Sequence, residues 1–265
     1  MACKSDELFA STAPYYARYR AGYPAELYEY LRRRFGLNGT QRVLDLGTGT
    51  GVLALPLARL AAEVIAVDPE PGMLAEGRRL AAERNMCNID WRQGDSAGLL
   101  DLGTGPVFLT VMGAAFHWMD REQVLCDLDR ITEPGGAVVL ASGGAPGSVE
   151  PPSWLGVIAR VRKRYLGEAR RAGSSTYDHP AEPHQQVAAR SPFANVEIQV
   201  WDRMVSRTLD QVIGLQFSYS YSSPAQLGSD EEAFEADLRA ALTEAQPSGI
   251  FEELTRTEAI IGTRP

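Results

Sequence analysis

The fold is decided by Val43-Leu44-Asp45-Leu46-Gly47-Thr48-Gly49-Thr50-Gly51, an apolar strand pattern that runs directly into alternating glycines. The apolar run GVLALPLARLAA follows and predicts a helix, which Pro56 should delay or kink. Glycine permits positive φ and close approach of a ligand, and the N-terminus of a helix offers unpaired N–H groups. The segment therefore predicts a ligand-binding turn between a buried strand and a helix.

Strand and helix patterns alternate on the C-terminal side of this turn. They read EVIAVD, PGMLAEGRRLAAERN, NIDWRQGD, PVFLTVM, DREQVLCDLDRI and AVVLAS, and they extend to Ser142. Such alternation predicts an α/β fold with a parallel sheet. The chain has 265 residues, of which 45% are hydrophobic, so one elaborated α/β domain can bury a sizeable core.

Flanking segments complete the predicted organisation. We expect an N-terminal helical lid over residues 1–36, a cofactor-binding core over 37–142, an inserted cap over 143–192, and C-terminal elements over 193–265 that complete the sheet. The elements expected outside the core are helices over 24–35, 154–171 and 208–220, a helix opened by a capping box at 229–232, and strands over 196–200 and 259–262.

Composition excludes several classes of function. A net charge of −8 disfavours binding to nucleic acid and to anionic membranes. Lys4 and Lys163 are the only lysines, which leaves almost no candidate for Schiff-base chemistry. The three cysteines show no CxxC spacing, so neither a disulfide framework nor a metal site is expected. Without a leader pattern or an apolar span of about 20 residues, the chain is expected to be soluble, unprocessed and cytoplasmic.

Asp68 adds a second feature to the glycine turn. The strand EVIAVD ends at this residue, 17 positions after Gly51. A carboxylate at that place can accept hydrogen bonds from both hydroxyls of a ribose. The pair of features predicts a nucleoside ligand, although a tight turn without ligand and a helix-capping aspartate are the plainer interpretations.

The spacing GxGxG, with Asp45 two residues before Gly47, resembles motif I of the class I S-adenosylmethionine (SAM)-dependent methyltransferases. The resemblance spans about residues 42–142 and implies a Rossmann-like, seven-stranded, mostly parallel sheet with helices on both faces, and SAM as cofactor. It also implies cofactor contacts, which are Asp45, Gly47, Thr48, Gly49, Gly51, Asp68, Pro69, Met73, Asp95, Ser96, Met112 and Gly113. Asp95 could instead be a plain turn residue.

A closer likeness is to the small-molecule branch that contains trans-aconitate methyltransferase relatives and many natural-product methyltransferases. It rests on residues 19–24 (YRAGYP), 115–120 (AFHWMD) and 218–220 (SYS), with Ala21 where that branch usually has proline. The likeness implies that Tyr19 and Arg20 fold over the cofactor. The expected substrate contacts are Tyr16, Trp118, His179, His184 and Tyr219, although the tyrosines could simply pack the first helix.

His117 and Asp120 are the candidate catalytic residues. His117 follows a strand at the end of an open α/β sheet where ligands bind, and its ordinary pKa of about 6.5 suits a general base. The alternative is a structural histidine, because many methyltransferases act mainly by aligning their reactants. Asp120 is also placed to cap the next helix.

These features predict an enzyme that moves a methyl group from SAM to an amine or hydroxyl of a small molecule, with antibiotic biosynthesis or other secondary metabolism as the setting. The acidic charge favours an amine-bearing, aminosugar-like substrate, and an O-methyltransferase of a polyketide, phenol or sugar is the alternative. A nicotinamide oxidoreductase and a non-methylating SAM-fold protein stay open. No nucleic-acid, membrane or metal partner is expected, and the chain is expected to be a monomer or homodimer.

Overall fold

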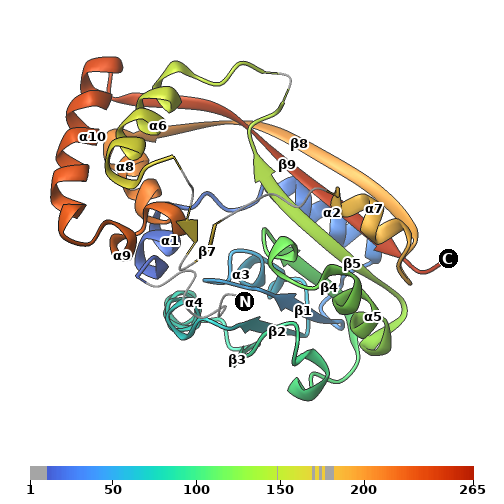
Figure 1. Cartoon of the computed structure of the whole chain (residues 1–265). Coiled ribbons are helices and arrows are strands. Elements are labelled where there is room, and N and C mark those ends of the chain that lie inside the picture. Colours follow the sequence, from blue (N-terminus) through green and yellow to red (C-terminus); the bar gives the residue numbers. More distant parts are fainter. Residues whose placement is uncertain (1–10, 148, 169–170, 173–174, 177–181) are drawn as a thin grey trace. The chain divides into compact units, whose positions relative to one another are not determined.

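The computed structural model describes residues 11–147, 149–168, 171–172, 175–176 and 182–265. These residues form two compact units (Figure 1), each built from separate stretches of the chain. Unit 1 comprises the described residues within 1–21, 144–178 and 202–256, and unit 2 comprises those within 22–143, 179–201 and 257–265. The four-part division expected from the sequence stays a prediction.

The sheet has seven strands in the order β3-β2-β1-β4-β5-β9-β8. Its strands are β1 (Arg42–Leu46), β2 (Glu63–Asp68), β3 (Ile89–Gln93), β4 (Val107–Gly113), β5 (Thr132–Gly144), β8 (Asn195–Thr208) and β9 (Ile250–Thr263). β1 to β5 pair in parallel. The α/β, Rossmann-like fold predicted from the sequence is confirmed.

Strand register brings the predicted cofactor residues together. Leu46, the last residue of β1, pairs with Val67 of β2. Gly47 follows Leu46 in the chain, and Asp68 follows Val67. The glycine turn therefore begins beside the carboxylate that ends β2. In an open parallel sheet this carboxyl edge is where ligands bind.

Helices cover both faces of the sheet in unit 2. On one face, Val43, Val64, Leu109 and Val139 pack in a cluster with apolar residues of α2 (Ala25–Phe35) and α3 (Ala54–Leu57). On the other, Leu44, Ile65, Val67 and Leu140 pack with α5 (Arg121–Ile131) and α7 (His184–Ala189). α4 (Pro71–Glu83) contacts β2 and β3. Two 3-10 turns, η2 (Leu99–Leu102) and η3 (Phe116–Trp118), follow β3 and β4.

Local signals set the ends of several helices as expected. α2 stops at Gly36, whose φ of 61° is left-handed. α4 begins with Pro71 in its first turn, where the missing N–H costs nothing. Asp120 caps α5, because its Oδ1 accepts a hydrogen bond from the Gln123 N–H at 3.1 Å.

Other expectations about secondary structure are corrected. The helix after the glycines starts late, as expected from Pro56, but it is only the single turn α3, which contains that proline. The capping box is at Thr208 and Gln211 of α8, whereas α10 has no side-chain cap at residues 229–232. The helix expected over 154–171 is α6, which ends at Leu166. β8 and β9 are much longer than the strands expected at 196–200 and 259–262.

Unit 1 is mainly helical. It contains α1 (Ala13–Tyr19), α6 (Ser153–Leu166), α8 (Leu209–Phe217), α9 (Pro224–Leu227), α10 (Glu231–Ala245), the turns η4 (Ser220–Ser222) and η5 (Gly228–Asp230), and the short antiparallel pair β6 (Arg171–Ala172) and β7 (Ser175–Thr176). Its core includes Trp154, Phe217, Phe234, Leu238 and Phe251. α10 packs on both α6 and α8.

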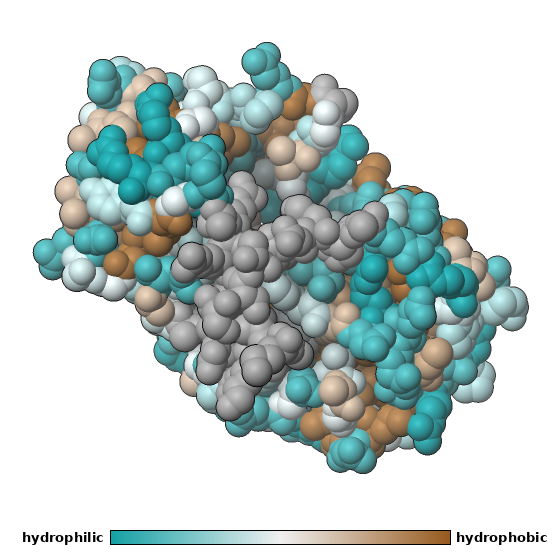
Figure 2. All heavy atoms as spheres, viewed as in Figure 1, coloured by the Kyte–Doolittle hydropathy of each residue, from teal (hydrophilic) through white to brown (hydrophobic). Residues whose placement is uncertain are grey.

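Hydrophilic side chains make up most of the coloured surface in Figure 2, with apolar residues in small separate groups. Among the described residues, no helix combines the length and apolar character needed to cross a bilayer. The described cysteines, Cys87 and Cys126, are free thiols. No cluster of three or more metal-ligating His, Cys, Asp or Glu side chains is present in the part of the chain that the structure describes.

Candidate functional site

The glycine turn has the conformation that its sequence predicts. Gly47, Gly49 and Gly51 have φ values of 74°, 55° and 82°, which residues other than glycine rarely adopt. A Cβ on Gly47 would lie 2.5 Å from the Cβ of Ala115, closer than packing allows. Backbone conformation and close approach therefore both require glycine here.

Asp45 stabilises the glycine turn through hydrogen bonds. Its Oδ2 accepts hydrogen bonds from the Thr48 hydroxyl at 2.6 Å and from the Ala54 N–H at 2.9 Å, which joins the turn to α3. Its Oδ1 is buried and has no partner among the described residues. Burial raises the pKa of Asp45 to about 7. A buried carboxyl with one unsatisfied oxygen is costly for the fold alone, so it points to a role connected with a ligand or ordered water.

Asp68 is bonded to the same turn. Its Oδ2 accepts a hydrogen bond from the Gly49 N–H at 2.8 Å, and its Oδ1 accepts one from the Glu70 N–H at 3.0 Å. The side chain is buried, and burial raises its pKa. The two strongest sequence signals, the glycines and the acid that ends β2, therefore form one structural unit.

The remaining predicted cofactor residues of unit 2 lie on α4 and on the segments after β2, β3 and β4. Met73 is buried in α4, and the carbonyl of Pro69 accepts a hydrogen bond from Gln93 at 3.2 Å. Asp95 is exposed, and its Oδ1 accepts hydrogen bonds from the N–H groups of Ala97 and Gly98. Asp95 thus stabilises a turn, as the plainer interpretation expected, while half-buried Ser96 follows it.

The carboxyl ends of β4 and β5 line a small cavity of about 20 Å³. That volume is on the scale of one water molecule and too small for a methyl acceptor. Its lining includes Met112, Ala114, Ala115, Phe116, His117, Ser142 and His184. The rings of His117 and His184 stack with centroids 6.4 Å apart, and His117 lies 4.9 Å from Trp118. The structure therefore brings predicted base and predicted substrate residues together in unit 2.

Arg121 is a second contact of His184 that the sequence did not reveal. Arg121 Nη1 lies 3.2 Å from His184 Nδ1 and also donates to the carbonyl of Glu182 at 2.8 Å. Burial first, and the charge of Arg121 second, lower the pKa of His184. Both effects favour the neutral form of His184.

The predicted lid and substrate residues of unit 1 form a stack of aromatic rings around Arg20. Its guanidinium lies between the rings of Tyr16 and Tyr219, at 4.9 and 4.1 Å from their centroids. Arg20 Nε donates to the Ser218 hydroxyl at 2.9 Å and Nη2 to the Ser218 carbonyl at 3.3 Å. The structure therefore unites Tyr16, Arg20 and Tyr219 within unit 1. His179 lies outside the described residues.

Tyr19 packs against α8 in the same unit. A Cβ on Gly214 would lie 2.3 Å from the Tyr19 ring, so glycine is needed for this close packing. Tyr19 therefore has a structural role in unit 1.

Sequence reasoning also missed Trp91 and Tyr23. A Cβ on Gly51 would lie 2.6 Å from the Trp91 ring, and a Cβ on Gly77 would lie 2.3 Å from it. A glycine inside a helix pattern, as Gly77 is, was the available signal for such close packing. The Tyr23 hydroxyl donates to the carbonyl of Ala141 at 3.3 Å and lies beside Gly113.

Comparisons with known proteins agree with this geometry. Residues 43–136 match the family described as "Methyltransferase domain". An uncharacterized methyltransferase of Mycobacterium tuberculosis (strain ATCC 25618 / H37Rv) is 28% identical over 221 residues, which cover 83% of this chain and 80% of the relative. The ubiquinone biosynthesis O-methyltransferase of Azorhizobium caulinodans is 31% identical over 38% of this chain and 40% of its own length.

A solved structure described as a type II methyltransferase, from Anaeromyxobacter dehalogenans, has the same fold. Its TM-score is 0.59 at 21% identity, over 92% of this chain and 97% of that one. Fold, glycine turn and family match together define a class I SAM-dependent methyltransferase, and this chain is one. Its cofactor is S-adenosyl-L-methionine. The nicotinamide-dependent alternative has no support from these matches.

Proposed function

We propose that this methyltransferase binds SAM against the turn Gly47–Gly51 and transfers the methyl group to an amine of a polar small molecule. The hydrogen bond from the Gly49 N–H to Asp68 Oδ2 carries the proposal, because it fixes the acid that ends β2 against the glycine turn. A ribose at this edge of the sheet would meet Asp68, while the glycines leave room for the backbone to approach the rest of the cofactor.

The residues present fit that cofactor. Asp45 has a buried oxygen without a partner, and the positive φ values of Gly47, Gly49 and Gly51 form a tight turn of backbone that a ligand can approach closely. Gly47, Thr48, Gly49 and Gly51 would face the methionine part and the ribose, with Asp45 stabilising the turn. We assign the further contacts to Pro69, Met73, Asp95, Ser96, Met112 and Gly113, with Asp95 toward the adenine.

Tyr19 and Arg20 are proposed to close over the cofactor. The hydrogen bonds of Arg20 to Ser218 use Nε and Nη2, which leaves Nη1 to pair with a carboxylate. The ring stack of Tyr16 and Tyr219 holds the guanidinium in place. Tyr16, Trp118, His179, His184 and Tyr219 are the proposed substrate contacts.

SAM supplies an electrophilic methyl group on a sulfonium. The chain's own residues have to hold the acceptor in line, exclude water and remove a proton. We propose His117 as the base, because it lies at the end of β4 next to His184 and Trp118. Asp120 is the second candidate, although its Oδ1 already caps α5.

The acidic charge of the chain supports the amine acceptor, since a negative surface concentrates cations. The alternative is a hydroxyl acceptor, which the similarity to a ubiquinone biosynthesis O-methyltransferase favours. We further propose a role in secondary metabolism such as antibiotic biosynthesis, a cytoplasmic location, and no binding to nucleic acid.

Calorimetry with SAM, S-adenosylhomocysteine and NADH tests the cofactor site. We expect both sulfur compounds to bind and NADH not to bind. A panel of matched amines and alcohols, with release of S-adenosylhomocysteine as the readout, tests the acceptor. Preference for neutral alcohols, with kinetics insensitive to ionic strength, would exclude the amine proposal and leave the cofactor site intact.

A further inference from the structure

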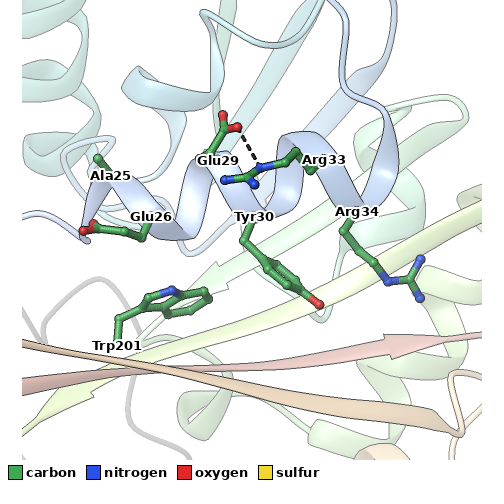
Figure 3. A pocket seen from close by; sticks show the side chains of 7 residues that line it. All are labelled: Ala25, Glu26, Glu29, Tyr30, Arg33, Arg34 and Trp201. Carbon is green, nitrogen blue, oxygen red and sulfur yellow. Dashed lines mark ion pairs between the residues drawn. The ribbon is translucent and has the colours of Figure 1, made fainter.

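A groove runs along α2 beside β8, within unit 2 (Figure 3). It has a volume of about 660 Å³, and we name it the α2 groove after its lining residues Ala25, Glu26, Glu29, Tyr30, Arg33, Arg34 and Trp201. Spacings of three and four place the α2 members on one side of the helix. None of these residues belongs to the proposed cofactor or substrate site.

Two aromatic rings form the middle of the α2 groove. Tyr30 extends from α2 and Trp201 from β8, and their rings meet edge to face with centroids 5.9 Å apart. The Tyr30 hydroxyl donates a hydrogen bond to Glu197, which holds the ring in place. Rigid aromatic side chains of this kind are enriched at protein interfaces.

Charge is divided along the α2 groove. Glu26 and Glu29 lie toward the start of α2, and Arg33 and Arg34 lie at its end. Glu29 pairs with Arg33 at 2.8 Å and Arg34 with Glu197 at 3.4 Å. Glu26 has no ion pair among the described residues. The groove therefore has an acidic half, an aromatic centre and a basic half.

The neighbouring strand β8 is an edge of the sheet. Ile198 and Val200 on this strand are 45% and 49% exposed. Exposed apolar residues on a long edge strand favour association, and natural proteins usually avoid or cover them. These two residues alternate with Glu197 and Trp201 along β8 and therefore lie on the sheet face away from the α2 groove, so the edge supports association without forming part of the groove.

We propose that a second copy of this chain covers the α2 groove across a two-fold axis near Tyr30. Two-fold symmetry makes the two α2 helices antiparallel and sets each patch against itself. Glu26 then faces the partner's Arg33, and Arg33 faces the partner's Glu26, while the aromatic centres meet at the axis. The inverted helix matches both halves of the charge pattern at once, and it also places opposite ends of the helix dipoles together.

Sedimentation velocity of the full chain with reversed charges tests this interface. We expect the wild-type chain to dimerise, and Glu26→Arg and Arg33→Glu each to raise the dimer dissociation constant about tenfold or more, since each creates two symmetric repulsions. The double variant Glu26→Arg/Arg33→Glu restores the attraction and should return within about threefold of wild type. Arg84→Glu, an exposed change of the same charge at the end of α4, is the control.

Three results would overturn the proposal. If the wild-type chain stays monomeric at every accessible concentration, no second copy covers the α2 groove. If the single variants have the same dimer dissociation constant as Arg84→Glu, the dimer contact lies elsewhere. The same conclusion follows if the double variant dimerises as weakly as the single variants. Circular dichroism of each variant separates loss of association from loss of fold.

A disulfide cross-link tests the same arrangement without a measurement of how stable the dimer is. Residues 26 and 33 are seven positions apart on α2, about 10 Å along the axis, which is too far for a disulfide within one chain. With Cys3, Cys87 and Cys126 changed to serine, Glu26→Cys/Arg33→Cys should oxidise to a covalent dimer on a non-reducing gel, whereas each single cysteine variant should not. A monomer band from the double variant would contradict the antiparallel arrangement.

Discussion

Arg121 Nη1 meets His184 Nδ1 at 3.2 Å, and this contact decides which ring nitrogen of the histidine holds the proton. A guanidinium has only donors, so Nδ1 must accept and Nε2 must be protonated. Since the pKa of His184 is also lowered, the residue offers the cavity beside His117 a neutral N–H donor. The two histidines of the site therefore have different roles, and only His117 is proposed as a base.

The first prediction concerns this tautomer. In ¹⁵N NMR spectra of the histidine rings, His184 should show an unprotonated Nδ1 and a pKa below the ordinary value of about 6.5. Arg121→Met should allow the ring proton of His184 to occupy Nδ1 and should raise the pKa of His184. Arg130→Met on the same helix should change neither property. A wild-type ring with the proton on Nδ1 would contradict the assignment.

The same shift has a consequence for stability. As the pH falls through about 6.5, the unfolded chain takes up a proton on His184 that the folded chain resists. The folded state therefore loses stability on acidification toward the lowered pKa of His184. Urea unfolding should show a shallower loss in Arg121→Met than in wild type over that interval.

The second prediction concerns Asp68. Asp68→Ala should weaken SAM binding by roughly 1–3 kcal/mol, because charge-assisted hydrogen bonds to the ribose are lost. Asp90→Ala, on the edge strand β3, is the matched control and should bind normally. Calorimetry gives the affinities, and an unchanged value for Asp68→Ala would refute the ribose assignment.

The sequence predicted these cofactor features because their signals are local. The glycines, Asp68 and the Asp120 cap each depend on a few neighbouring residues. β8 was underestimated because residues 202–206 alternate between half-buried and exposed, so their apolar pattern is weak. The capping box was misplaced because both Thr208-Leu-Asp-Gln211 and Ser229-Asp-Glu-Glu232 satisfy the motif. The partnership of Arg121 with His184 joins residues 63 positions apart, which no short pattern can reveal.

The third prediction concerns His117. His117→Ala should lower kcat by about 10²- to 10⁴-fold, the usual contribution of a general base, with little change in SAM affinity. Trp118→Phe provides a neighbouring change that leaves the imidazole in place. Steady-state kinetics across neutral pH give the result, and wild-type turnover in His117→Ala would remove the base assignment.

The fourth prediction concerns the buried carboxyl of Asp45. With a pKa near 7 in the folded chain and about 3.9 in the unfolded chain, the folded state binds the proton more tightly. Stability due to this group therefore falls as the pH rises from about 4 to 7. Asp45→Asn, which cannot ionise, should gain stability relative to wild type between pH 5 and pH 8.

Urea unfolding at several pH values measures that gain. Asp95→Asn, an exposed carboxyl in a turn, is the control and should follow the wild-type curve. Parallel curves for Asp45→Asn and wild type would show that Asp45 does not titrate in this range.

The fifth prediction concerns Gly77 and Trp91. Gly-to-Ala changes inside helices usually stabilise by about 1 kcal/mol. Here the new Cβ would lie 2.3 Å from the Trp91 ring, so Gly77→Ala should instead destabilise, by about 1–3 kcal/mol from overpacking. Trp91→Leu should relieve the clash, and a double-mutant cycle by thermal unfolding measures that coupling. Independent effects of the two changes would contradict the contact.

The last strand has a consequence for synthesis of the chain. Ala259 and Ile261 of β9 pack in one apolar cluster of unit 2, and Ile260 packs in the other. Both apolar layers of the sheet therefore stay incomplete until residues 259–261 have been synthesised. A nascent chain that already contains the glycine turn and Asp68 still lacks these core residues, so termination before position 259 should yield an aggregation-prone fragment rather than a smaller working enzyme.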